Sequence, residues 1–350
     1  MRRAIILTNG LLQSDDAKTA HGLVRESNRY KIVGLVDHNH AGNDAGILLD
    51  GTHRNIPVYA TVQEALQAKP EVCIVGVATV GGMFPGTLLE EVKEAIQFKL
   101  DIVNGLHDHL DKRPEIKKLA AENGVELIDI RAPKKLQELH FWTGKIFEIT
   151  TPIVAVLGTD CALGKRTTAR SVMNACNEAG MSTQMIYTGQ TGWLQGGKYG
   201  FIFDSTLNDF VSGELEHAII TCNEETRPDV IFLEGQSALR NPSGPCGSEL
   251  LISGNAKSVI LVHAPKRKYY EHQKSWGEIP PLESEISLIQ QLGSGVIAIA
   301  LNTKHCSDEE AFVFQKEYEE KFGIPILLPL QEGCEKIVPV IKKLSQKNKR

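Results

Sequence analysis

TPIVAVLGTDCALGKRTTARS, residues 151–171, carries the strongest structural signal in this chain. An apolar run (153–157) gives way to a loop bounded by Gly158 and Gly164, and a helical pattern begins at Lys165. The spacing fits G-x-x-x-x-G-K, which predicts a buried strand, a phosphate-binding loop and the start of a helix. The helix N-terminus adds its partial positive charge to the charge of the lysine, so the stretch predicts an anion site.

Arg166 departs from the usual form of this loop. Ser or Thr normally follows the lysine and places its hydroxyl on Mg²⁺, whereas here the hydroxyls come one and two positions later, at Thr167 and Thr168. The loop therefore favours phosphate binding over hydrolysis of a magnesium nucleotide. The residues expected to contact the phosphates are Gly158, Thr159, Asp160, Cys161, Gly164, Lys165, Arg166, Thr167 and Thr168.

The composition is that of an ordinary globular protein. A chain of 350 residues predicts two domains of about 100–200 residues each. The net charge of -5 gives no field that would draw the protein to nucleic acid or to an anionic membrane, and no apolar run is long enough to span one. The seven cysteines form no C-x-x-C pair, which argues against a zinc site or a disulfide framework. We therefore expect a cytoplasmic protein with no metal, nucleic-acid or membrane partner.

The first half of the chain alternates strand-like apolar runs with helical patterns, which predicts a doubly wound parallel sheet with right-handed crossovers. The second strand ends at Asp37, as in dinucleotide-binding folds. The loop after the first strand, at 8–12, lacks G-x-G-x-x-G, which argues against a nicotinamide cofactor. The expected strands are 4–9, 30–37, 72–79, 101–105 and 125–130, and the expected helices are 16–26, 58–68 (with Thr61 as N-cap), 88–99 and 112–123.

His107, Asp108 and His109 follow the strand expected at 101–105. They could form a metal-binding or acid–base cluster, because imidazole and carboxylate groups serve both purposes. They could also form a polar loop at the edge of the sheet, where side chains need not point together. The lack of any further motif nearby favours the polar loop.

Mixed residues at 133–147 mark a linker, and we place one α/β domain over 1–135 and a second over 136–350. The second domain repeats the same rhythm of strands and helices. Three acids at 209–216 are expected to complement the dipole of a helix that starts there, with Asp209 or Ser212 as its cap. The other elements expected are strands at 183–187, 230–233, 259–263, 295–301 and 324–330 and helices at 170–178, 282–292, 308–322 and 338–344.

Polar residues at strand ends are the candidates for a site, because ligands of open α/β sheets bind outside the carboxyl ends of the strands. Glu234 ends a buried strand and is the expected centre of chemistry, although a glutamate there can also brace the phosphate loop. His263 ends another strand, where a neutral imidazole suits proton transfer. Further candidates are Gln190 and Thr191 in the glycine-rich loop at 188–193, Arg240, Lys266, Arg267, and Asn302 with Lys304 for a nucleobase.

Four motifs follow one another in the second half of the chain: GTDCALGKRTT at 158–168, TGQTG at 188–192, DFVSG at 209–213 and EGQSALR at 234–240. The first resembles the loop of dethiobiotin synthetase. Together they resemble a two-domain bacterial and archaeal family long described as of unknown function. Its members pair a Rossmann-like N-terminal domain with a P-loop NTPase-like C-terminal domain. Some of them are assigned as D-glutamate N-acetyltransferases of D-amino-acid catabolism.

This resemblance implies transfer of an acetyl group from acetyl-CoA to the amine of a D-amino acid, with D-glutamate as the expected acceptor. A loop that holds the phosphates of acetyl-CoA hydrolyses no nucleotide, so it tolerates Arg166. The reaction needs a base for the substrate ammonium, and we expect Glu234, with His263 as the alternative. The cations expected to bind the carboxylates of glutamate are Arg240, Lys266 and Arg267, with Gln190 and Thr191 as further substrate contacts.

Two other classes of function stay open. An ATP-dependent ligase or kinase of the dethiobiotin-synthetase type would place Thr167 or Thr168 on Mg²⁺ and Glu234 near the metal. A regulatory nucleotide-binding protein would bind the same ligand without turnover. In each case we expect a homo-oligomer that acts on a small molecule.

Overall fold

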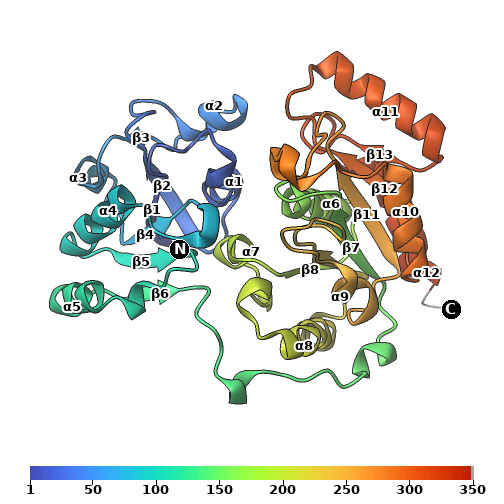
Figure 1. The fold of residues 1–350 in the computed structure, drawn as a ribbon, viewed down its shortest axis with the longest axis horizontal. Helices are drawn as coiled ribbons and strands as arrows, with labels where there is room; N and C mark the ends of the chain where they lie inside the picture. The colour runs from blue at the N-terminus through green and yellow to red at the C-terminus, as the bar shows by residue number, and fades with distance from the viewer. Residues whose placement is uncertain (348–350) are drawn as a thin grey trace. The chain divides into compact units, whose positions relative to one another are not determined.

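A computed structural model describes residues 1–347 of the chain. The chain divides into two compact units (Figure 1). The N-terminal unit comprises Met1–Pro133 together with Gln190–Gly197, and the C-terminal unit comprises Lys134–Gly189 together with the chain from Lys198 onward. Over the described residues, no helix combines the length and apolar character needed to cross a membrane.

The N-terminal unit is built on a six-stranded parallel sheet with the order β3-β2-β1-β4-β5-β6. The order reverses between β1 and β4, which is the arrangement of a Rossmann-like sheet. Its strands are β1 (Arg2–Leu7), β2 (Tyr30–Val36), β3 (Val58–Tyr59), β4 (Val72–Val75), β5 (Asp101–Asn104) and β6 (Leu127–Asp129). Its helices are α1 (Lys18–Arg25), α2 (Ala45–Asp50), α3 (Val62–Ala65), α4 (Gly86–Gln97), α5 (Pro114–Asn123) and α7 (Gln190–Leu194).

Alternate residues of β1 feed two cores on the two faces of this sheet. Ile5 and Leu7 pack with α3, α4 and α5, whereas Ala4 and Ile6 pack with α1 and α2. A central strand buried on both faces produces the continuous apolar run seen in the sequence. The prediction of a doubly wound parallel sheet is therefore confirmed.

The C-terminal unit holds a seven-stranded parallel sheet with the order β13-β12-β11-β7-β10-β8-β9. Helices α6 and α12 cover one face of it, and α8 to α11 cover the other (Figure 1). Its strands are β7 (Ile153–Gly158), β8 (Thr183–Tyr187), β9 (Tyr199–Gly200), β10 (Val230–Glu234), β11 (Ser258–His263), β12 (Gly295–Leu301) and β13 (Ile326–Leu327). Its helices are α6 (Lys165–Glu178), α8 (Asn208–Thr226), α9 (Ser248–Ile252), α10 (Leu282–Gln291), α11 (Asp308–Phe322) and α12 (Val338–Lys347).

Three local predictions were wrong. Val58 and Tyr59 pair with β2 as a short strand instead of opening a helix, although Thr61 does cap α3 by accepting a hydrogen bond from the Glu64 amide at 3.2 Å. The glycine-rich segment expected as a loop at 188–193 contains α7. Neither Asp209 nor Ser212 caps α8, which begins at Asn208 and has no side-chain cap.

Glu214 and Glu216 of α8 bind residues 134–146, the segment that enters the C-terminal unit, instead of complementing the helix dipole. Glu216 is buried and accepts hydrogen bonds from the Thr143 amide at 2.6 Å and the Ile146 amide at 3.1 Å. Glu214 accepts from the His140 amide at 2.9 Å and pairs with Lys134. These two acids lie beyond the first turn of α8, so the dipole has little effect on them, whereas Asp209 lies in the first turn, as predicted.

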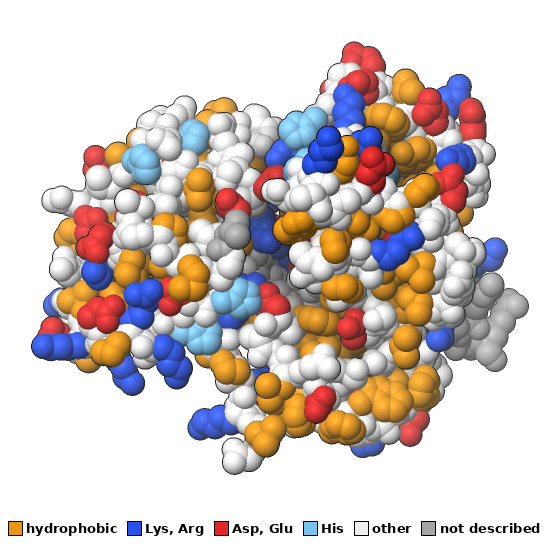
Figure 2. Space-filling model, in the orientation of Figure 1, with side chains coloured by type: hydrophobic (Ala, Val, Ile, Leu, Met, Phe, Trp, Pro, Cys, Tyr) orange, Lys and Arg blue, Asp and Glu red, His pale blue; other side chains and the backbone are white. Residues whose placement is uncertain are grey.

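Figure 2 shows that positive and negative side chains are interspersed over the face it draws.

Candidate phosphate-binding site

The predicted phosphate loop connects β7 to α6, and its backbone supplies the geometry of an anion site. Gly164 adopts φ 89° directly before the helix and accepts a hydrogen bond from the Thr168 amide at 2.8 Å. A side chain at Gly158 would lie 3.1 Å from the Lys165 side chain, which packs over this glycine. The positive φ of Gly164 thus favours glycine there, and a larger residue at Gly158 would push the Lys165 side chain from its position.

Lys165 is 6% exposed, and its ammonium group lies inside the loop. The Nζ atom donates to the carbonyl oxygens of Asp160 and Ser237, both at 2.7 Å. The first carbonyl belongs to the phosphate loop and the second to the segment after β10. A buried ammonium held between two strand ends places a positive charge at this edge of the sheet, which suits an anion-binding loop.

Asp160 joins three loops through its buried carboxylate. Its oxygens accept hydrogen bonds from Arg267 Nη1 at 3.0 Å, from Asn241 Nδ2 at 3.0 Å and from the Glu271 amide at 2.8 Å. Arg267 also donates to the Cys161 carbonyl oxygen at 2.7 Å. Since the Arg267 side chain is only 6% exposed and pairs with Asp160, the structure places it in the support of the loop.

The tip of β10 carries Glu234, which is 4% exposed. Its Oε2 accepts a hydrogen bond from the Thr188 amide at 3.0 Å, and the Gly189 amide also donates to the carboxylate. Burial raises the pKa of Glu234 above its usual value, although the positive charges of Arg166 and Lys165 and the two amides oppose this shift. A carboxylate with a raised pKa is a stronger base, and this one also braces the segment after β8.

His263 ends β11 beside the phosphate loop. Its Nδ1 lies 3.0 Å from the Thr159 hydroxyl. Burial lowers the pKa of His263 to about 4, so the imidazole is neutral at physiological pH. The structure thus joins a phosphate-loop residue to one of the two predicted proton-transfer residues.

The other predicted cations lie in contact with acidic side chains. Arg240 Nε donates to Glu285 at 2.7 Å, and Lys266 pairs with Glu310. Asn302 supports the phosphate loop, because its Nδ2 donates to the Leu163 carbonyl oxygen at 3.0 Å while its Oδ1 accepts from the Lys304 amide at 2.9 Å.

Gln190 and Thr191 belong to the N-terminal unit, although they follow the phosphate loop in the sequence. The Thr191 hydroxyl lies 3.0 Å from the Thr19 hydroxyl, and the Gln190 side chain packs over Gly105. The structure therefore gives these two predicted substrate contacts partners in the N-terminal unit.

Asp108 of the histidine-rich segment forms an ion pair within the N-terminal unit. It binds Arg113 Nη2 at 2.7 Å, and this guanidinium lowers the pKa of Asp108. The same carboxylate accepts from the Phe84 amide at 3.3 Å. These contacts favour the polar-loop interpretation of the segment around His107 and His109.

Asn241 and Glu271 were not predicted as part of this site. Asn241 Nδ2 lies within 3.2 Å of Glu271 Oε1 as well as 3.0 Å from Asp160. Asn241 directly follows the EGQSALR motif, so the end of that motif was a usable signal. Glu271 has φ 47° and belongs to no motif, so nothing in the local sequence indicates its position.

One group of potential metal ligands lies in this site within residues 1–347. Single ligand atoms of Asp160, Cys161 and Glu271 lie within 4.8 Å of one another. The Asp160 oxygens already accept from Arg267 and Asn241, and a guanidinium on a carboxylate opposes a cation there. The donor set therefore suits a hydrogen-bonded brace better than a metal centre.

These features define a Rossmann-like unit and a P-loop unit in one chain. Residues 38–133 match the model "Domain of unknown function (DUF1611_N) Rossmann-like domain", and residues 140–338 match the model "Domain of unknown function (DUF1611_C) P-loop domain". The chain belongs to the DUF1611 family.

Solved and curated relatives support this assignment. A crystal structure of a DUF1611 family protein from Anabaena variabilis matches with a TM-score of 0.89 at 27% identity, covering 98% of this chain and all of that one. A protein from Pseudoalteromonas sp named D-glutamate N-acetyltransferase is 29% identical over 284 residues, which are 79% of this chain and 83% of the relative. One of the same name from Tritonibacter scottomollicae is 27% identical over 288 residues, 80% of this chain and 84% of that relative.

Proposed function

We propose that this protein transfers the acetyl group of acetyl-CoA to the amine of an amino acid, with D-glutamate as the acceptor. Two relatives that bear the name D-glutamate N-acetyltransferase align with about four fifths of the chain, and this supports the acyltransferase class. The observation that carries the proposal in this chain is the phosphate loop itself. Lys165 is buried within this loop, which supports anion binding, while Arg166 takes the position of the magnesium-binding hydroxyl.

In the proposed reaction the loop from Gly158 to Thr168 holds phosphates of acetyl-CoA and takes no part in bond breaking. The ammonium of the acceptor loses one proton to the base, and the neutral amine attacks the thioester carbonyl to form a tetrahedral intermediate. Collapse of this intermediate breaks the carbon–sulfur bond and releases CoA as a thiolate. The nitrogen loses its second proton to this thiolate as the amide forms, and the first proton leaves the base for solvent. The chain supplies the anion site and a base.

We propose Glu234 as that base, because burial raises its pKa and it lies at a strand end next to the loop. His263 is the alternative base, although its lowered pKa makes it the weaker one.

Incubating the protein with acetyl-CoA and single amino acids tests the proposal. Mass spectrometry should detect the N-acetyl product with D-glutamate, and less of it or none with L-glutamate and D-alanine. A product with another amino acid alone would keep the acetyltransferase class and correct the acceptor. The absence of any acetylated product across the full set of amino acids would refute the proposal.

A further inference from the structure

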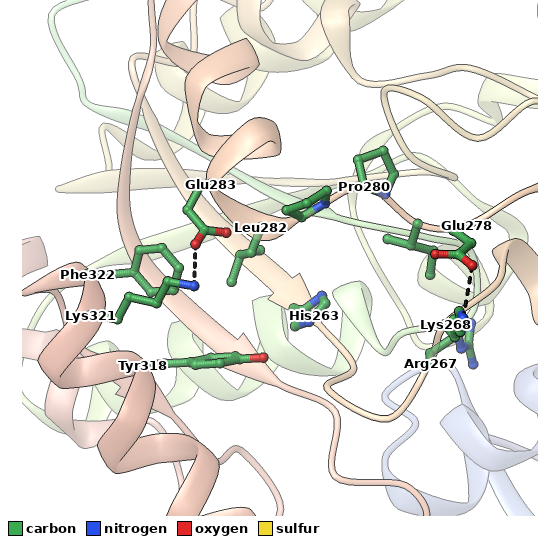
Figure 3. Close-up of a pocket in the computed structure, with 12 residues that line it drawn as sticks. His263, Arg267, Lys268, Glu278, Pro280, Leu282, Glu283, Tyr318, Lys321 and Phe322 are labelled. Carbon is green, nitrogen blue, oxygen red and sulfur yellow. Dashed lines mark ion pairs between the residues drawn. The ribbon is translucent and has the colours of Figure 1, made fainter.

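A cavity of about 290 Å³ opens at the carboxyl end of β11 (Figure 3). It lies between the segment after β11, the start of α10 and the end of α11, all in the C-terminal unit. Its lining includes His263 and Arg267, together with Lys268, which follows Arg267 in a run of three cations. Its apolar walls comprise Ile279, Pro280, Pro281, Leu282, Tyr318 and Phe322.

Two residues that line the cavity also contact the phosphate loop. His263 Nδ1 lies 3.0 Å from the Thr159 hydroxyl, and Arg267 Nη1 lies 3.0 Å from Asp160. The strands behind them are neighbours in the sheet, since the Thr159 amide donates to the Val262 carbonyl oxygen. Whatever occupies the cavity therefore lies one strand away from a bound phosphate group.

The cavity combines aromatic walls with charged ends. Figure 3 shows Tyr318 pointing its hydroxyl toward His263, with the Lys321–Glu283 pair at one end and the Lys268–Glu278 pair at the other. Exposed ion pairs of this kind are weak, so a ligand phosphate can compete for their lysines. The centre offers a neutral imidazole and aromatic surface, which suit a nucleobase better than a second anion.

We propose that this cavity binds the adenosine moiety of the phosphate-bearing co-substrate. This inference deepens the proposed function, since adenosine is directly attached to the pyrophosphate of CoA, and it holds equally for ATP. The base packs against Tyr318 and Phe322, His263 offers a polar contact, and the phosphates extend over the end of β7 to Lys165.

This proposal moves nucleoside recognition away from the end of β12. Asn302 was the residue predicted for the base, but its amide donates to the Leu163 carbonyl oxygen. The Thr303 hydroxyl beside it accepts from Gln331 at 2.7 Å. Both side chains therefore hold loops together, whereas the cavity presents aromatic surface.

Calorimetric titration with three probes measures the contribution of the adenosine. CoA, ADP and 4′-phosphopantetheine each carry phosphate, but the last lacks the 3′-phospho-AMP part of CoA, which comprises the adenosine and two further phosphates. The Phe322→Ala variant described below separates the base from these phosphates. We expect CoA to bind about tenfold or more tightly than 4′-phosphopantetheine, because base stacking contributes at least that factor. Equal affinity for these two probes, or no binding of either CoA or ADP, would overturn the proposal. Titration with ATP distinguishes the two possible sources of the adenosine. An affinity for ATP above that for CoA would indicate that the ligand is a nucleoside triphosphate.

Phe322→Ala and Phe312→Ala form a matched pair on α11. Phe322 lines the cavity, while Phe312 is 44% exposed and does not. We expect Phe322→Ala to weaken binding of CoA and ADP about tenfold and to leave 4′-phosphopantetheine unchanged, with Phe312→Ala like the wild type. Equal effects of both substitutions, or of Phe322→Ala on all three probes, would contradict the proposal.

Photolabelling with 2-azido-ADP locates the adenosine site in the wild-type protein, so the result does not depend on the folding of a variant. Label on peptides containing 278–283 or 318–322 supports the proposal, and label confined to 302–304 or 328–334 overturns it. Neither readout depends on acetyl transfer. A labelled cavity without acetylated product would refute the proposed function alone, and an active enzyme labelled elsewhere would refute the cavity alone.

Discussion

Lys165 provides the sharpest test at the scale of single residues. Its buried ammonium must bind the phosphates if the loop does, so Lys165→Ala should weaken CoA binding about 10- to 100-fold by the usual value of a charge-assisted hydrogen bond. Calorimetry measures this change. Lys316→Ala, at an exposed lysine of α11, is the control and should bind CoA normally. Unchanged affinity in a folded Lys165→Ala variant would show that the loop holds no phosphate.

The Glu234→Gln variant distinguishes a catalytic base from a residue that only holds the segment after β8 in place. Glutamine keeps the shape and can accept from the Thr188 amide, but it cannot take up a proton at neutral pH. We expect the rate of acetyl transfer to fall about 100-fold or more with the dissociation constant of CoA unchanged. Loss of CoA binding with the rate preserved at saturation would assign Glu234 to bracing, and His263→Asn would then test the alternative base.

The contiguous motif made part of the site predictable. Gly158, Gly164 and Lys165 have the positions that their spacing indicated, because the loop is determined by local sequence. Arg267 was predicted to bind substrate but binds Asp160, and Glu271 was not predicted at all. Those contacts join Asp160 to residues more than 100 positions away in the sequence, so no local sequence pattern predicts them.

Among the elements, helix α8 also makes contacts with residues far away in the sequence, because Glu216 binds the linker. Glu216→Ala would leave the buried Ile146 amide and the partly buried Thr143 amide without their acceptor, which should cost about 2–3 kcal/mol of unfolding free energy. Urea denaturation measures the loss, and trypsin should cut faster after Lys135 and Lys145.

Glu224→Ala is the matched control on the same helix, because Glu224 is exposed. It should unfold and be cleaved like the wild type. If both variants behaved alike, the contacts of Glu216 with the linker would contribute nothing to stability.

Helix α4 carries a pH-dependent element of the N-terminal unit. Burial, with Asp37 and Glu94 nearby, raises the pKa of Glu91 from 4.5 to about 7. The folded protein therefore keeps a proton that the unfolded chain releases, so the stabilisation from Glu91 is complete below pH 4.5 and is lost as the pH rises through 7. Glu91→Gln stays neutral and should be more stable than the wild type by about 2–3 kcal/mol at pH 8, but not at pH 4.5.

Urea denaturation at the two pH values checks this sign. Glu90→Gln, at an exposed position paired with Lys93, is the control and should show no such pH dependence. A Glu91→Gln effect of equal size at pH 4.5 and pH 8 would show that protonation of Glu91 is not linked to folding.

Long elements were predictable and short ones were not. The helix expected at 308–322 matches α11, because an amphipathic period and a Ser307 cap define it locally. Val58 and Tyr59 form a strand only through pairing with Leu35 and Val36, which the sequence around them does not report. The type of an element was therefore predictable where residues within the element determine it, and not where pairing with a distant strand does.

At the scale of the whole molecule, the division of the chain is set by contacts distant in sequence. Gln195 Nε2 donates to the carbonyl oxygens of Gly22 at 2.8 Å and Glu26 at 3.0 Å, and the Arg29 guanidinium lies 4.1 Å from the centre of the Trp193 ring. These contacts assign 190–197 to the N-terminal unit. The alternation of strands and helices predicted two parallel sheets. It did not indicate that residues 190–197 belong to the N-terminal unit.

Acetyl transfer to D-glutamate is the activity that distinguishes the proposed function from an ATP-dependent ligase or kinase. The most direct measurement follows free thiol from acetyl-CoA with D-glutamate and, in parallel, phosphate from ATP and Mg²⁺ with the same acceptor. We predict thiol release that depends on D-glutamate and no release of phosphate. Magnesium-dependent phosphate release without thiol release, for any amino acid supplied, would contradict the claim and indicate an ATP-dependent ligase or kinase.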